Sequence, residues 1–144
     1  MQLDINYLAV VAAAVWGFVL GGIWYSPKVF GERWAEHVGL AGNPPPTAQA
    51  MRAMALFVVG MFFISFVLAH NMAAWTPATW LAGGAQANWA RGLEAGFWTW
   101  LGFIFPVQLG VTVFEMKRPG YLLINTSFYL LALLGMGLIL AIWP

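Results

Sequence analysis

Long apolar segments of this sequence contain a few polar side chains, and these are the residues that could do chemistry. One set, the inner polar group, consists of Arg52, Gln108, Thr112, Glu115 and Asn125. The spacing from Gln108 to Thr112 and Glu115 places these three on one face of a helix. Because buried polar groups are costly unless paired, the group predicts hydrogen bonds with an Arg52–Glu115 ion pair, or a polar pocket whose ionisable member is Glu115.

A second set, the outer polar group, lies toward the other ends of the same segments and consists of Asn6, His70, Asn71, Arg91 and Glu94. Arg91 and Glu94 are three residues apart, which predicts a local pair on one helix. His70 predicts a hydrogen-bond partner, because zinc typically needs about four ligands and the chain has two histidines and no cysteine. We therefore expect neither a metal ion nor another cofactor.

Motifs of known catalytic machinery are missing from the sequence. Gly-x-Ser-x-Gly, the phosphate-binding loop and His-Glu-x-x-His are all absent. The formal net charge of +1 provides no basic surface for nucleic acid. We therefore predict no catalytic residues, no enzyme activity and no nucleic-acid partner.

The elements that must position these polar groups follow from composition and segment length. Hydrophobic residues make up 62% of the chain and charged residues 8%, against about 25% charged in soluble domains. Four apolar segments, at about residues 5–25, 50–75, 92–114 and 121–143, reach the ~20 residues that cross a bilayer. Lipid offers no partner for the backbone, so each must be a helix. We predict one all-α domain over 1–144, with four transmembrane helices and the lipid bilayer as its partner.

A short amphipathic helix is predicted between the first two membrane helices, at about residues 27–38. Ser26 suits the N-cap, and Pro27 suits the first turn. Phe30, Trp34 and Val38 then recur every four residues among charged ones. Such a helix either lies on the membrane surface or packs on a neighbouring subunit.

Glycine and proline mark where the membrane helices approach or bend. Gly17 and Gly21 form one Gly-x-x-x-Gly pair, and Gly92 and Gly96 form another. Such pairs let helix backbones come close, either within one chain or between two copies. Pro106 lies inside the third segment and predicts a kink there.

Basic residues indicate the orientation in the membrane. Five fall in the two loops that share one side, and one falls on the other side: Lys28, Arg33, Arg52, Lys117 and Arg118 against Arg91. Because positively charged loops stay in the cytoplasm, both termini are predicted outside.

Several of these residues together resemble a known family. The segments concerned are Asn6-Tyr7, Gly22-Ile23-Trp24-Tyr25-Ser26-Pro27, Phe30-Gly31, Trp34, the stretch from Glu115 to Pro119, and Leu123-Ile124-Asn125. They are similar to the DUF1761 family of small bacterial membrane proteins, which is defined as a domain of unknown function. The resemblance implies four membrane helices in the bacterial cytoplasmic (inner) membrane. It supplies no reaction. It directs attention to Trp24, Tyr25, Pro27 and Trp34, with Asn6, Glu115 and Asn125.

Two functional classes remain open at this point. The small size, the glycine pairs and the amphipathic helix favour a homo-oligomeric membrane-embedded binding or assembly module. The alternative is a transporter or channel component for a small ion or solute that uses the inner polar group. The sequence does not identify a ligand for either class.

Overall fold

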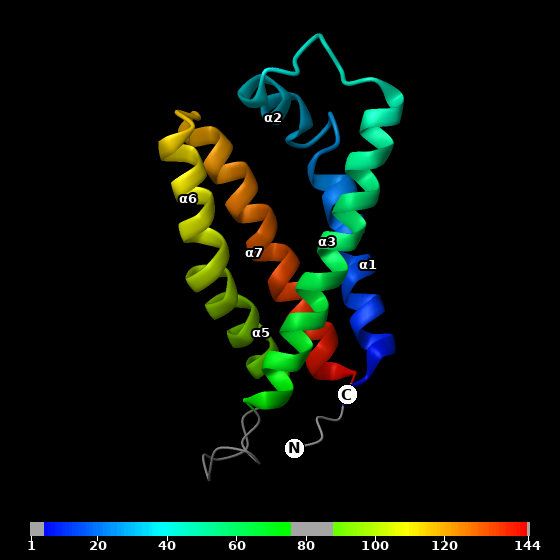
Figure 1. Ribbon diagram of the computed structural model, residues 1–144. Helices are drawn as coiled ribbons and strands as arrows, with labels where there is room; N and C mark the ends of the chain where they lie inside the picture. The colour runs from blue at the N-terminus through cyan, green and yellow to red at the C-terminus, as the bar shows by residue number, and fades with distance from the viewer. Residues whose placement is uncertain (1–4, 76–87, 144) are drawn as a thin grey trace.

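The computed structural model describes residues 5–75 and 88–143, and the regular structure in these ranges is helical (Figure 1). The elements in chain order are α1 (Tyr7–Trp24), α2 (Gly31–Val38), α3 (Thr47–Ala74), α5 (Asn88–Thr99), the π-helical η1 (Trp100–Ile104), α6 (Phe105–Phe114) and α7 (Pro119–Ile142). Within the described residues, α1, α3, the continuous α5–η1–α6 helix and α7 are long and apolar enough to cross a membrane. The predicted all-α fold with four membrane helices and a short helix between the first two is confirmed.

Helix ends follow local sequence signals. The Asn6 side chain accepts hydrogen bonds from the backbone N–H groups of Leu8 (3.0 Å) and Ala9 (3.2 Å), which satisfies two free donors at the start of α1. Gly39 ends α2 in the left-handed conformation, with φ at 79°. Asn6, which was predicted in the outer polar group, is therefore a helix cap.

The last helix, α7, forms the centre of the bundle. It packs against α5, α1, α6, α2 and α3, and Figure 1 shows it between the α5–α6 arm and α1. The core consists of buried side chains of α7, α3 and α1. Those of α7 are Phe128, Ala132, Leu133 and Met136; α3 contributes Met61 and Leu68, and α1 contributes Ala13. In the most apolar stretch of each membrane helix, 44% of the residues are buried in α7 and only 6% in the third membrane helix.

Both glycine pairs are used inside the chain. A Cβ at Gly92 would collide with the carbonyl of Gly137, and one at Gly96 would lie 2.5 Å from the carbonyl oxygen of Leu133. On α1, a Cβ at Gly17 would meet Met136 at 2.5 Å, and one at Gly21 would meet a ring atom of α3 at 2.8 Å. The partner of each pair, which the sequence left open, is therefore another helix of the same chain.

The third membrane helix is interrupted just before its proline. The Phe105 N–H donates to the Trp100 carbonyl five residues earlier, which is the π-helical pattern of η1. Pro106 occupies the first turn of α6 and has no N–H to donate. The irregularity that the proline predicts takes the form of a widened π turn on its N-terminal side.

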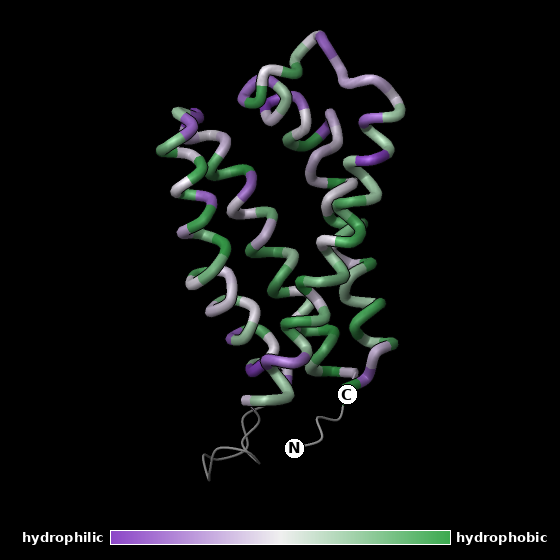
Figure 2. The backbone as a smooth tube through the Cα atoms, viewed as in Figure 1, coloured by the Kyte–Doolittle hydropathy of each residue, from purple (hydrophilic) through white to green (hydrophobic). Residues whose placement is uncertain are grey.

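The short helix α2 packs on its own chain. The Phe30 ring lies 4.6 Å from that of Trp24, and the Trp34 ring lies 5.6 Å from that of Tyr25 in an edge-on arrangement. His37 rests against Gly120 in the first turn of α7. The helix begins at Gly31, four residues later than predicted, so Pro27 belongs to the preceding turn. Figure 2 shows hydrophilic residues gathered at this end, with hydrophobic ones along the long helices.

Replacing Gly92 by alanine tests the close crossing of α5 and α7. We expect Gly92→Ala to lower the free energy of unfolding by about 1–3 kcal/mol, because the added Cβ would force the two backbones apart. Gly110→Ala is the control, since a Cβ there meets nothing within 4 Å. That variant should be neutral or more stable by up to about 1 kcal/mol, because alanine favours the helix. Titration with a denaturing detergent measures the free energy of unfolding of both variants. Equal losses of stability in the two variants would contradict the close crossing of α5 and α7.

Candidate functional site

Two consecutive side chains at the end of α1 bind α7. The indole Nε1 of Trp24 donates to the carbonyl of Ile124 at 3.0 Å. The hydroxyl of Tyr25 donates to Oδ1 of Asn125 at 2.8 Å. Asn125 is buried at 6% exposure, so its amide needs such a partner. Residues separated by about a hundred positions in the sequence are thereby joined at two adjacent points of α7.

Aromatic rings surround the Tyr25 phenol. Its ring lies 5.3 Å from that of Phe128 and 5.6 Å from that of Trp34. Burial raises the pKa of the Tyr25 phenol above its ordinary value, and the nearby Tyr129 and Tyr121 phenols raise it further. Tyr25 therefore stays protonated at physiological pH and keeps its role as donor to Asn125.

The turn after α1 explains the residues that follow Tyr25 in the family signature. The Gly31 N–H donates to the Ser26 carbonyl at 2.9 Å, and the Phe30 N–H donates to the Trp24 carbonyl at 3.1 Å. A Cβ at Gly31 would collide with the Tyr25 carbonyl, so only glycine fits there. The Ser26 hydroxyl donates back to the Ile23 carbonyl at 2.7 Å and does not cap α2 as predicted. The turn directs α2 back over the ends of α1 and α7.

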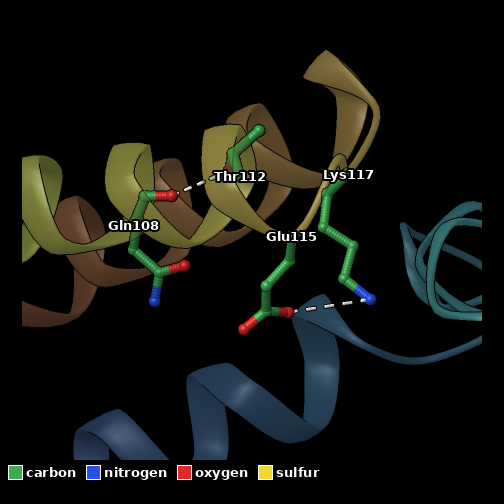
Figure 3. A network of polar contacts seen from close by, with 4 residues as sticks. All are labelled: Gln108, Thr112, Glu115 and Lys117. Atoms are coloured by element: carbon green, nitrogen blue, oxygen red, sulfur yellow. Dashed lines mark hydrogen bonds and ion pairs between the residues drawn. The ribbon is translucent and has the colours of Figure 1, made fainter.

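Members of the inner polar group on α6 are engaged locally. Thr112 donates to the backbone carbonyl of Gln108 at 2.8 Å, and the Gln108 Oε1 atom is buried without a hydrogen-bond partner. Lys117 Nζ lies 3.9 Å from Glu115 Oε2, and the Glu115 side chain is 58% exposed. Figure 3 shows Gln108 and Glu115 extending from the same side of the helix, with the Lys117 ammonium beside the Glu115 carboxylate. Glu115 is therefore a solvated surface group.

The other two members of the inner polar group, Asn125 and Arg52, do not lie on α6. Asn125 bonds Tyr25, and Arg52 is exposed near the start of α3. No ion pair within 4.0 Å joins Arg52 to Glu115, so the pair predicted from the sequence is replaced by Lys117–Glu115. The inner polar group is thus dispersed over three different environments.

The outer polar group is also dispersed. His70 Nδ1 lies 2.7 Å from the Phe66 carbonyl, and its ring lies 4.1 Å from the Phe66 ring, which fits the predicted hydrogen-bonding role. The Arg91 guanidinium donates to Asn88 Oδ1 at 3.1 Å. Asn71 and Glu94 lie exposed. Among the described residues, no three His, Cys, Asp or Glu side chains are placed to hold a metal ion.

Two further interhelical bonds were missed at the sequence level. The Trp100 indole donates to the Thr126 carbonyl at 2.8 Å, and the buried Ser65 hydroxyl donates to the Val10 carbonyl at 2.8 Å. In each case the acceptor is a backbone carbonyl, which keeps a second lone pair after it accepts its helix hydrogen bond. Every residue has such a carbonyl, so the sequence does not indicate which one accepts. The one feature of the sequence that could have predicted these bonds is the presence of an isolated donor, a serine or an indole, inside an apolar helix.

Together these features define a protein with four candidate membrane helices, joined by hydrogen bonds from Trp24, Tyr25, Ser65 and Trp100 to neighbouring helices. The chain belongs to the DUF1761 family, described as a protein of unknown function, because the family model matches residues 8–141. The family resemblance in the sequence is thus confirmed. No curated protein and no solved structure matches the chain significantly.

Removing the Tyr25 hydroxyl tests the link between α1 and α7. We expect Tyr25→Phe to lower the free energy of unfolding by about 1–3 kcal/mol, because the buried Asn125 amide loses its partner. Tyr7→Phe is the matched control, since Tyr7 is 58% exposed. Unfolding in mixed micelles, followed by circular dichroism, measures both. Indistinguishable stabilities of the two variants would contradict the assigned bond.

Proposed function

We propose that this protein is a homo-oligomeric membrane-embedded binding or assembly module that catalyses no reaction. We place it in the bacterial cytoplasmic membrane with both termini outside. The observation that carries the proposal is the contrast between a tightly bonded α1–α7 unit and a third membrane helix that has few fully buried residues. The first provides a rigid scaffold, and the second provides an apolar surface for assembly.

The polar side chains support a scaffold rather than a pathway. A transport route needs polar groups that face a common space within the bundle. Here the hydroxyls of Ser65, Thr112 and Thr126 donate to backbone carbonyls, and the Tyr25 hydroxyl donates to Asn125 Oδ1. The Ser65 and Tyr25 bonds fix helices relative to one another, whereas the two threonine bonds stay within their own helices. The described bundle has no line of ionisable groups.

The orientation is supported by the position of the basic residues. Lys28 and Arg33 lie in the α1–α2 region, and Lys117 and Arg118 lie between α6 and α7. The loops that carry them meet at one end of the bundle, where His37 of α2 contacts α7. Positive loops are retained in the cytoplasm, so this end is assigned to the cytoplasmic side.

The surface proposed for assembly is the outer face of the α5–η1–α6 helix. A Cβ at Gly102 or Gly110 would meet nothing within 4 Å, so these small residues face open space. Exposed apolar neighbours include Phe103 and Val107, at 70% and 62% exposure. Small residues on a lipid-facing helix permit close approach of a second helix. The glycine pairs of α1 and α5 are already occupied within the chain, whereas Gly102 and Gly110 are free to meet a second copy.

Cysteine cross-linking tests the assembly, because the natural chain has no cysteine to interfere. We expect Gly110→Cys to form a disulfide-linked dimer in membranes under mild oxidation, because Gly110 lies on the proposed face. Val15→Cys, on the exposed side of α1 at 52% exposure, is the control and should stay monomeric. Equal cross-linking of both, or a monomeric mass in native mass spectrometry, would contradict the proposal.

A transport component is the second candidate, and one observation favours it. The Gln108 Oε1 atom is buried in α6 without a hydrogen-bond partner, which is costly in an apolar setting. A water or ion passing along α6 would satisfy it. The test is solute flux in proteoliposomes. Flux with the natural chain that is abolished by Gln108→Leu would establish a transport component in place of the module.

A further inference from the structure

A small pocket lies between α2 and the segment that leads to α3. Its volume is about 280 Å³, close to the lower limit for small-molecule sites. Two aromatic side chains, one carboxylate and three proline rings are among its lining residues: Tyr25, Trp34, Glu32, Pro27, Pro44 and Pro45. The pocket therefore adjoins the turn that the signature residues build.

The aromatic side of the pocket is held in place before any ligand arrives. Tyr25 is fixed by its hydroxyl bond to Asn125, and the Trp34 ring lies edge-on against it. The turn below them is closed by the Gly31–Ser26 backbone bond, at a position where only glycine fits. The proline residues of the lining have a fixed backbone φ. Such a preorganised site loses little conformational entropy when it binds.

The charge of the pocket is negative. Glu32 supplies a carboxylate, and Tyr25, the other titratable lining residue, stays protonated. No lysine or arginine lines the pocket, although Lys28 and Arg33 are near Glu32 in the sequence. Within the described chain, Glu32 forms no ion pair within 4.0 Å. Its charge is therefore available to a cationic ligand.

We propose that this pocket binds an organic ammonium group. Aromatic rings attract such a cation through their π faces, and the carboxylate adds a direct charge contact. The pocket adjoins Tyr25, the residue that follows the candidate membrane span of α1, so the ammonium belongs to a free small cation or to an aminophospholipid headgroup. The inference rests on the binding role proposed above, but its test does not depend on assembly.

Calorimetric titration with choline is the first test. The protein is placed in nanodiscs of phosphatidylglycerol, whose headgroup has no ammonium. We expect choline to bind saturably and 3,3-dimethylbutan-1-ol, its uncharged isostere, to bind at least about tenfold more weakly, since it lacks the charge. Equal binding of the two compounds would overturn the proposal.

Matched variants on α2 locate the site. Glu32→Gln keeps the shape of the pocket and removes its charge, so choline affinity should fall about tenfold. Glu36→Gln removes an exposed carboxylate on the same helix that does not line the pocket, and it should leave the affinity unchanged. Equal effects of the two variants would overturn the assignment, because they would indicate a general surface charge effect.

Native mass spectrometry distinguishes the two sources of the ammonium. Retention of phosphatidylethanolamine over phosphatidylglycerol, lost in Glu32→Gln, would assign the pocket to a lipid headgroup. Choline binding without such retention would assign it to a free cation. Absence of both choline binding and phosphatidylethanolamine retention would overturn the proposal. The cross-linking result on assembly would be unaffected, so failure of the ammonium site and failure of the proposed module can be told apart.

Discussion

The bonds from Trp24 and Tyr25 to α7 are the interaction on which the rest of the structure depends. Lipid tails are as apolar as helix surfaces, so helices in a bilayer are held by close packing and hydrogen bonds. The Tyr25–Asn125 bond sets the depth at which α1 meets α7, and the Trp24–Ile124 bond adds a second point one residue away. Two adjacent bonds fix both the position and the rotation of one helix against the other.

The remaining helices and the turn follow from that unit. Glycines of α5 allow it to approach α7 at the opposite end, and the glycine faces of α1 receive side chains of α3 and α7. The turn from Ser26 to Gly31 then brings α2 over the joined ends of α1 and α7. The Tyr25 side chain that bonds Asn125 also forms part of the wall of the pocket.

Sequence patterns predicted the elements of this fold better than their contacts. Segment length and hydropathy identified four membrane helices, because lipid permits few other structures. Gly39 correctly marked the end of α2, but Ser26 was a misleading cap signal, since its hydroxyl bonds back to α1. Spacing grouped Gln108, Thr112 and Glu115 on one face, yet it could not show that Thr112 would bond a backbone carbonyl. The Tyr25–Asn125 pair is separated too far in sequence for any local pattern to join.

The most direct test of the central bond is a double-mutant cycle on Tyr25 and Asn125. The free energies of unfolding of Tyr25→Phe, Asn125→Ala and the double variant are compared with that of the natural chain. If the side chains bond each other, the two single losses overlap, with a coupling free energy of about 0.5–2 kcal/mol. Strictly additive losses would show that the residues act independently and would contradict the α1–α7 link on which this account is built.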